Sequence, residues 1–290
     1  MTNIGDLVFD IDAIVFDLDG TLYPGYATLD FYLDHVLTRG GLPERRDEVR
    51  SLATAILDGV HQEIRMGEFV RGTPGTEQFA RLVPEEYRDI GENGWTYLGD
   101  GWTVVHYLTR SYGIPRELYI EAFHQSRYAM SRGELPFVPS PLWRETFDRL
   151  RAAGVFLVMQ TNSSEDSGIP TLEYLGIADT FDEYIYSAEK PTGMEMVFRR
   201  LREERGVEAE RILSVGDHPW NDIDSARRLG GRTLLISPFR GFDSAGFEPR
   251  IHGEDELLSV LLRIGEERAR RRDATATDTA ATVAPRGRGR

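Results

Sequence analysis

Residues 13–21 read AIVFDLDGT, a short apolar run that ends in two acids, a glycine and a threonine. A run of this kind, bounded by a turn signal, is typical of a strand buried within a sheet. Its acids are Asp17 and Asp19. An earlier copy of the pattern Phe-Asp-x-Asp contains Asp10 and Asp12. Only the later pair follows the strand and precedes a turn, so we expect that pair to carry chemistry. The earlier pair is expected to be solvated acids at the opposite end of the strand.

The chain alternates between strand and helix patterns from residue 136 onward. Strands are expected at 155–159, 183–187, 211–217 and 232–237, and helices at 141–153, 168–175, 193–205 and 221–229. Such alternation predicts a parallel sheet with helices on both faces. Because the strand at 13–19 fits the same sheet, we expect an α/β fold with a Rossmann-like parallel sheet.

The intervening block, residues 26–135, has a different pattern. Helical periodicity is found at 28–39, 46–64 and 116–131. No stretch of the block resembles a buried parallel strand. We therefore expect an all-helical cap inserted into a core that is made of residues 1–25 and 136–265. Residues 266–290 are low in apolar content, which predicts a disordered tail.

The charge balance argues against several classes of function. The net charge is −14 over 290 residues. Residues 266–290 contain seven Arg and four acids, a balance of +3, so residues 1–265 carry −17. A field of that sign repels nucleic acids and anionic membranes, and we expect neither as a partner.

Composition also bears on location. No apolar run approaches the ~18 residues of a membrane span, and the N-terminus lacks a basic-then-apolar signal pattern. The chain contains no cysteine, so disulfides and thiolate metal sites are not available. A cytoplasmic location is the expectation.

Lysine occurs once in the chain. The 34 basic residues are 33 Arg and Lys190. A bias this strong leaves lysine mainly where arginine cannot substitute, at a site that needs a compact ammonium rather than a planar fork. Lys190 is therefore a candidate functional residue.

Polar residues gather at the expected strand ends. Ligands of an open parallel sheet bind beyond the carboxyl ends of its strands. The residues expected there are Asp17, Asp19, Gly20, Thr21, Thr161, Asn162, Ser163, Lys190, Asp217 and Asp222. Grouped carboxylates would raise one another's pKa by repulsion, and a divalent ion resolves this. Oxygen ligands suit Mg²⁺, which is commonly bound by one or two carboxylates and a phosphate. The set predicts a Mg²⁺ site that exposes an aspartate as a nucleophile for phosphoryl groups.

Four short motifs carry a family resemblance. The order FDLDGT, QTNSS, EKP and VGDHPWND resembles the four motifs of the haloacid dehalogenase-like superfamily. The match covers residues 13–25 and about 136–237. The block between them resembles that superfamily's helical cap in position and character.

The resemblance implies roles for the catalytic residues. Asp17 would attack phosphorus and become phosphorylated. Asp19 would protonate the leaving alcohol and then deprotonate the hydrolytic water. Thr161 would donate a hydrogen bond to the phosphoryl oxygens, and Lys190 would neutralise charge on Asp17 and on the phosphoryl group.

The resemblance also implies the ligand sets. Mg²⁺ would be held by the carboxylates of Asp17 and Asp217 and by the backbone carbonyl of Asp19, with Asp222 orienting that shell. The residues expected to bind substrate are Gly20, Thr21, Asn162 and Ser163.

These roles imply a Mg²⁺-dependent phosphatase for a small phosphomonoester, either a nucleoside monophosphate or a sugar phosphate. An acid at Asp19 argues against dehalogenase chemistry, and the absence of a second lysine argues against the Schiff base of phosphonate cleavage. DLDGTLYP loosely resembles the first motif of pyrimidine 5′-nucleotidase-like members, which favours nucleoside monophosphates slightly. A phosphomutase on the same core and a non-catalytic regulatory protein are the alternatives, and the oligomeric state, a homodimer included, is left open.

The expected cap contains the candidates for reading the leaving group. Its aromatic and basic candidates are Trp95, Tyr97, Trp102, His106, Tyr107, Arg110 and Tyr128, with Arg65, Arg71, Arg127 and Arg132 as further candidates for anion contacts. Most of the aromatic residues are expected to form the cap's own core, and most of the arginines to be solvated. His218, in the last motif, is expected either to pack its loop or to contact substrate.

Overall fold

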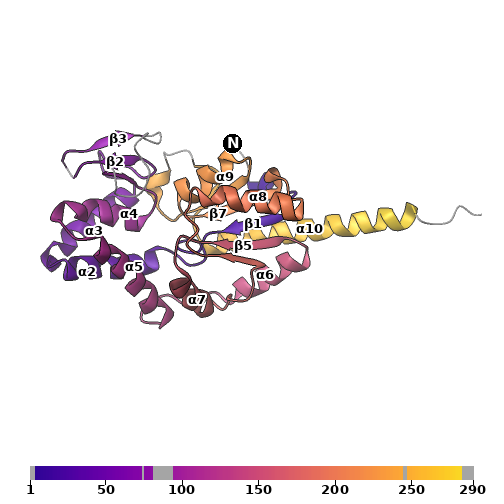
Figure 1. Ribbon diagram of the computed structural model, residues 1–290, viewed down its shortest axis with the longest axis horizontal. Coiled ribbons are helices and arrows are strands. Elements are labelled where there is room, and N and C mark those ends of the chain that lie inside the picture. Colours follow the sequence, from indigo (N-terminus) through magenta and orange to yellow (C-terminus); the bar gives the residue numbers. More distant parts are fainter. Residues whose placement is uncertain (1–3, 74, 81–93, 244–246, 283–290) are drawn as a thin grey trace, which may run out of the picture.

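The computed structural model describes residues 4–73, 75–80, 94–243 and 247–282 (Figure 1). Within these residues, a six-stranded sheet has the order β6-β5-β1-β7-β8-β9. Its strands are β1 (Ala13–Phe16), β5 (Phe156–Gln160), β6 (Glu183–Ile185), β7 (Ile212–Gly216), β8 (Arg232–Ile236) and β9 (Arg250–Ile251). All of their pairings are parallel. The predicted α/β fold with a Rossmann-like sheet is confirmed.

Helices cover both faces of this sheet. Successive residues of β1 point to opposite faces, and because they are apolar, both faces must be buried. Ile14 and Phe16 enter one hydrophobic cluster and Ala13 and Val15 enter another. The first cluster is covered by α6 (Leu142–Ala152), α7 (Glu165–Tyr174) and α10 (Glu254–Thr282), and the second by α8 (Gly193–Arg205) and α9 (Ser225–Arg228). Figure 1 shows α8 and α9 on one side of the strands and α6 on the other.

The inserted block has a core of its own. Its helices are α2 (Tyr26–Arg39), α3 (Arg46–Leu57), α4 (Gly101–Thr109) and α5 (Arg116–Ser131). Buried residues from all four helices form one hydrophobic cluster, which also takes in Phe242 from the sheet side of the molecule.

The expectation of an all-helical cap is wrong. The strands β2 (Phe69–Arg71), β3 (Gln78–Ala80) and β4 (Trp95–Tyr97) form an antiparallel sheet in the order β3-β2-β4. Each strand is three residues long, which is too short to show the period of two that marks a strand in a sequence. The boundaries drawn between core and cap remain a prediction.

The second helix of the block is shorter than its periodicity predicts. It ends at Leu57, and Gly59 adopts a φ of +71° just beyond it. A Cβ at Gly59 would lie 3.0 Å from the Cα of Gly241, so the turn also brings two backbones together. Val60, which the predicted helix at 46–64 includes, lies beyond the observed helix and is 72% exposed.

The prediction of a disordered tail at 266–290 is wrong for residues 266–282. Helix α10 continues to Thr282, and residues 283–290 lie outside the described residues. Arg268 pairs with Asp12 at 2.6 Å, and Arg271 pairs with Asp10. The upstream acids therefore hold α10 instead of being merely solvated, and Asp12 pairs with Arg211 as well, at 2.7 Å.

In the described part of the chain, no helix combines the length and the apolar character that crossing a bilayer requires.

Candidate active site

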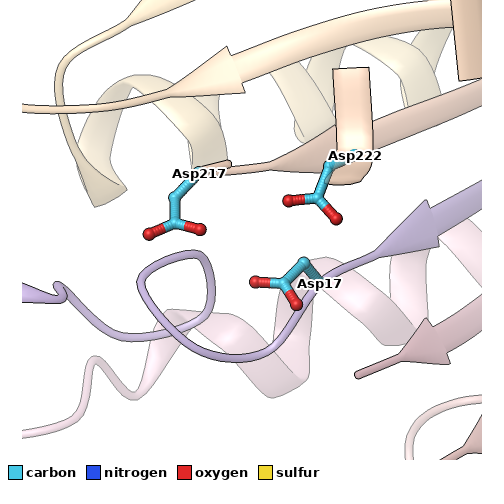
Figure 2. Close-up of side chains that lie close together, drawn as sticks. All are labelled: Asp17, Asp217 and Asp222. Atoms are coloured by element: carbon cyan, nitrogen blue, oxygen red, sulfur yellow. The ribbon is translucent and has the colours of Figure 1, made fainter. Parts of the chain in front are cut away.

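The sheet register brings the predicted site residues to one edge. Phe16 lies opposite Met159 of β5 and Val215 of β7, so the residues that follow these strands emerge together. The backbone N–H of Asp17 donates to the carbonyl of Val215 at 2.9 Å, which continues the ladder into the site. Figure 2 shows the carboxylates of Asp17, Asp217 and Asp222 facing one another across this edge.

Asp17 is buried and held at both oxygens. Its Oδ1 lies 2.6 Å from the Nζ of Lys190, and its Oδ2 accepts a hydrogen bond from Thr21 at 3.1 Å. Burial raises the pKa of Asp17 to about 7, and the charges of Asp222 and Asp19 add to this against the opposing charge of Lys190. The carboxylate therefore depends on nearby cations to remain ionised.

Lys190 is the buried cation among these acids. Its Nζ lies 2.7 Å from Asp222 and 2.6 Å from Asp17. Burial opposes its charge, but the two carboxylates outweigh burial and raise the pKa of Lys190 above its usual value. Asn162 fixes the backbone here, because its Oδ1 accepts from the Lys190 N–H at 2.7 Å and its Nδ2 donates to the Lys190 carbonyl at 3.3 Å.

The three carboxylates form a candidate cation site. Asp17, Asp217 and Asp222 each offer an oxygen, and these atoms lie within 4.8 Å of one another. Asp222 is engaged by Lys190 and by the backbone N–H of His218 at 3.1 Å. Among the residues that the structure describes, no donor contacts the Asp217 carboxylate, and burial beside Asp17 raises its pKa well above the usual value. Buried oxygen donors that repel one another fit a hard divalent cation such as Mg²⁺.

The predicted role of Gly20 and Thr21 in substrate binding remains a prediction, and the contacts that the structure shows for them are with the carboxylates. Gly20 has a φ of +83°, and a Cβ there would lie 1.9 Å from Oδ2 of Asp217. Thr21 is 2% exposed and donates to Asp17. Asp17 lines a cavity of about 740 Å³, and neither Gly20 nor Thr21 lines it. They shape the loop behind the carboxylates because the turn after β1 folds beneath the site.

Asp19 turns its carboxylate away from that cluster. Its Oδ2 accepts hydrogen bonds from Thr161 at 3.2 Å and from Ser163 at 2.8 Å. Its Oδ1 accepts from the hydroxyl of Tyr23 at 2.5 Å and lies 3.2 Å from the Nε of Arg127. The predicted metal contact of Asp19 concerns its backbone carbonyl and remains a prediction.

A cavity of about 740 Å³ lies between the strand ends and the inserted block. Its sheet side is lined by Asp17, Asp19, Thr161, Asn162, Ser163, Lys190, Asp217, His218 and Asp222. Its opposite wall includes Trp102, His106, Arg110, Tyr119, Phe123 and His124. The predicted catalytic residues thus share one space with three of the predicted cap candidates.

His218 packs its loop and faces this cavity. It is 6% exposed, its Nδ1 accepts from the backbone N–H of Asn221 at 3.2 Å, and its ring lies 5.3 Å from that of Tyr97. Burial lowers the pKa of His218, so the ring is neutral and carries its proton on Nε2. Phe69 and Tyr97 also pack on Trp220, which joins the small sheet to the loop after Asp217.

Two neighbours of Asp19 do not follow from the sequence. Tyr23 comes soon after the first motif, but nothing in that spacing distinguishes it from a core aromatic residue. Arg127 is a candidate for anion contacts, yet the anion that it contacts is Asp19 and it is 1% exposed. No local signal reveals that pair, because it depends on how α5 lies against the sheet edge.

Comparison with known proteins agrees with this geometry. The chain is 25% identical over 228 residues to a phosphoglycolate phosphatase of Agrobacterium fabrum, covering 77% of this chain and 79% of the relative. It is 27% identical over 158 residues to a ribulose-1,5-bisphosphate 5-phosphatase of Halopiger xanaduensis, covering 53% of this chain and 64% of the relative. The crystal structure of a HAD family hydrolase from Deinococcus radiodurans, with bound phosphate and sodium, has the same fold, with a TM-score of 0.51 at 16% identity and coverage of 88% and 97%.

The family assignment rests on the greater part of the chain. A family model described as haloacid dehalogenase-like hydrolase matches residues 11–230, which include every strand end discussed above. The four motifs lie at those strand ends, as the sequence predicts. The chain belongs to the haloacid dehalogenase-like hydrolases.

Proposed function

We propose that this protein is a Mg²⁺-dependent phosphatase that hydrolyses a small phosphomonoester through a phosphorylated Asp17. The observation that carries the proposal is the meeting of Asp17, Asp217 and Asp222 within 4.8 Å, with the Lys190 ammonium bridging Asp17 and Asp222. A nucleophilic carboxylate, a fixed cation and a cation site beside one cavity are what in-line phosphoryl transfer requires.

Asp17, Asp217 and the Asp19 carbonyl would hold the ion, with Asp222 supporting them. Bound there, Mg²⁺ would neutralise negative charge on the phosphoryl oxygens. Lys190 keeps its proton and holds Oδ1 of Asp17. One of the two oxygens of Asp17 forms the new bond to phosphorus. The bond from phosphorus to the leaving oxygen breaks as this bond forms.

Asp19 acts as the general acid in the first step and as the general base in the second. It gives a proton to the leaving alcohol oxygen and later takes one from the water that attacks the phosphorylated Asp17. The hydroxyl oxygen of Thr161 lies 3.2 Å from Oδ2 of Asp19. It can donate its hydrogen bond to that carboxylate or, when substrate is bound, to a phosphoryl oxygen. The net reaction converts a phosphomonoester and water into an alcohol and inorganic phosphate.

The cavity and the relatives support a substrate class. Two of the relatives are named for phosphoglycolate and ribulose bisphosphate, both small phosphorylated metabolites. The cavity of about 740 Å³ leaves room for more than a phosphoryl group, and its far wall is largely aromatic. We infer a sugar phosphate or a nucleoside monophosphate as the substrate.

The test measures phosphate release with Mg²⁺ across nucleoside monophosphates, sugar phosphates and phosphoglycolate. Asp17→Asn should lower turnover by at least about 10³-fold, because the amide cannot act as the nucleophile. Asp10→Asn is the matched control. It makes the same change in the earlier Phe-Asp-x-Asp copy, where Asp10 pairs with Arg211 and Arg271 away from the site, and it should retain full turnover. Equal turnover by both variants would exclude Asp17 as the nucleophile, and no release by a folded, Mg²⁺-binding wild type would refute the phosphatase.

A further inference from the structure

The carboxylate of Asp19 has two partners at each oxygen: three hydroxyl groups that donate to it and one guanidinium that forms an ion pair with it. Oδ1 has Tyr23 and Arg127, and Oδ2 has Thr161 and Ser163. An ionised carboxylate offers about four lone-pair sites. With hydrogen bonds at both oxygens and the Arg127 guanidinium beside Oδ1, neither oxygen is open to a leaving group or to water. At least one partner must give way before Asp19 can act.

The two partners of Oδ1 are the ones least able to give way. Arg127 is 1% exposed, and besides Asp19 its guanidinium donates to Ser167 at 3.1 Å and to Thr171 at 3.0 Å. Its planar fork is therefore fixed at both ends. Tyr23 is 1% exposed, its buried ring fixes the hydroxyl oxygen 2.5 Å from Oδ1, and it does not line the cavity where another acceptor could be bound.

The two partners of Oδ2 are exchangeable. Thr161 and Ser163 contact Asp19 through hydroxyl groups, which rotate about a single bond. Both residues line the cavity beside Asp17, where a phosphoryl group would offer them other acceptor oxygens. Redirecting these hydroxyls frees Oδ2 and leaves Oδ1 bound as before.

We propose that Arg127, assisted by Tyr23, is a positioning residue that anchors Oδ1 of Asp19 and thereby makes Oδ2 the oxygen that transfers the proton. This inference rests on the proposed phosphatase function. The leaving oxygen takes its proton from Oδ2 in the first step, and Oδ2 takes a proton from water in the second. Because Arg127 lies on α5 of the inserted block and its other partners lie on α7, the acid is aligned only while α5 packs against α7.

The test compares two esters that differ in their need for a proton. The p-nitrophenolate ion leaves readily without one, whereas an alkoxide does not. The ratio kcat/KM reports the steps up to the departure of the leaving group, so it isolates the acid step. It is measured for p-nitrophenyl phosphate and for the best alkyl phosphate of the panel, with full-length wild type, Arg127→Met, Arg127→Lys and Tyr23→Phe.

We expect Arg127→Met and Tyr23→Phe to lower kcat/KM for the alkyl ester by about 10- to 100-fold, with less than about a threefold loss for p-nitrophenyl phosphate. Arg127→Lys should recover part of the loss, because it keeps the charge but not the fork. The matched control is Arg132→Met just beyond α5. This anion-contact candidate is exposed, pairs with Glu134 and does not line the cavity. That control should leave both values unchanged.

An equal loss for both esters, or no loss for either, would overturn the positioning role while leaving the phosphatase standing. Tyr23→Phe removes a single hydroxyl, so it distinguishes these outcomes even where the buried Arg127→Met does not fold. Failure of the wild type to hydrolyse either ester would instead refute the proposed function, and this inference with it.

Discussion

Three carboxylates in one buried place create a competition between protons and a cation. Burial raises the pKa of Asp17 from 3.8 to about 7, and that of Asp217 is raised well above its usual value. A raised pKa of an acid means that the group contributes to stability below its unfolded pKa, and that this contribution is lost as the pH rises through the folded pKa. Without a cation, the ionisation of Asp17 therefore costs stability between about pH 4 and pH 7.

Mg²⁺ should offset that cost and so should stabilise the protein more as the pH rises. We expect the increase in melting temperature on replacing EDTA by Mg²⁺ to be small at about pH 5 and to grow up to about pH 8, since protons and Mg²⁺ compete for the same oxygens. Burial lowers the pKa of His106 to about 4, so its contribution to stability increases with pH, opposite to that of Asp17. The His106 contribution is the same with and without Mg²⁺, so subtracting one melting temperature from the other removes it.

Asp217→Asn should flatten this dependence, whereas Asp10→Asn should preserve it. No donor among the described residues contacts Asp217, so only a proton or a cation can neutralise its buried charge. Asp10, in contrast, is paired with Arg271. A Mg²⁺ effect independent of pH in the wild type would show that the ion binds elsewhere.

At the scale of elements, the strands and the helices packed on them follow from the sequence. The predicted helices at 116–131 and 193–205 coincide with α5 and α8, because each carries its apolar residues at a regular spacing. The strand-end residues of the site are predictable for the same reason, since parallel strands send their ends to one edge. The pair between Arg127 and Asp19 is not predictable, because it joins two segments through the packing of α5.

The disorder predicted for the tail is wrong for residues 266–282, because low apolar content does not exclude order. Residues 266–282 contain five Ala and four Arg, which are strong helix formers, so α10 can extend beyond the buried part that ends near Ile264. Low apolar content argues against burial of a segment and not against its helicity.

Deletion of residues 270–290 should leave turnover unchanged. Arg271 and Arg272 contact Asp10 and the carbonyl of Ala152, near the start of the sheet's strands, whereas the site lies at their carboxyl ends. Exposed ion pairs contribute little, so the melting temperature should fall by less than about 3 °C. Deletion of residues 254–290 is the contrasting control, because it removes the buried Leu257, Leu261 and Ile264 and should prevent stable folding. A large loss of turnover from the shorter deletion would show that the end of α10 supports the site.

In the proposed mechanism, phosphate chemistry and leaving-group recognition take place on opposite walls of one cavity. The sheet edge supplies Asp17 and Lys190, and the inserted block supplies Trp102 and Phe123, whose rings lie 5.4 Å apart in an edge-to-face contact. The block contacts the core on two sides of this space, through Arg127 at α7 and through Tyr97 at Trp220. Substitutions on the two walls should therefore have separable effects on binding.

Trp102→Leu should weaken binding of large leaving groups without weakening binding of phosphate. Loss of one aromatic wall is expected to raise KM for the best ester by about 10-fold, whereas the inhibition constant of inorganic phosphate should change by less than about twofold. Lys190→Met should instead abolish inhibition by inorganic phosphate. Tyr26→Leu removes an aromatic ring that is 58% exposed and does not line the cavity, so it should change neither constant. Weakened phosphate inhibition in Trp102→Leu would mean that the two walls do not act independently, because the inserted block would then shape the phosphate site itself.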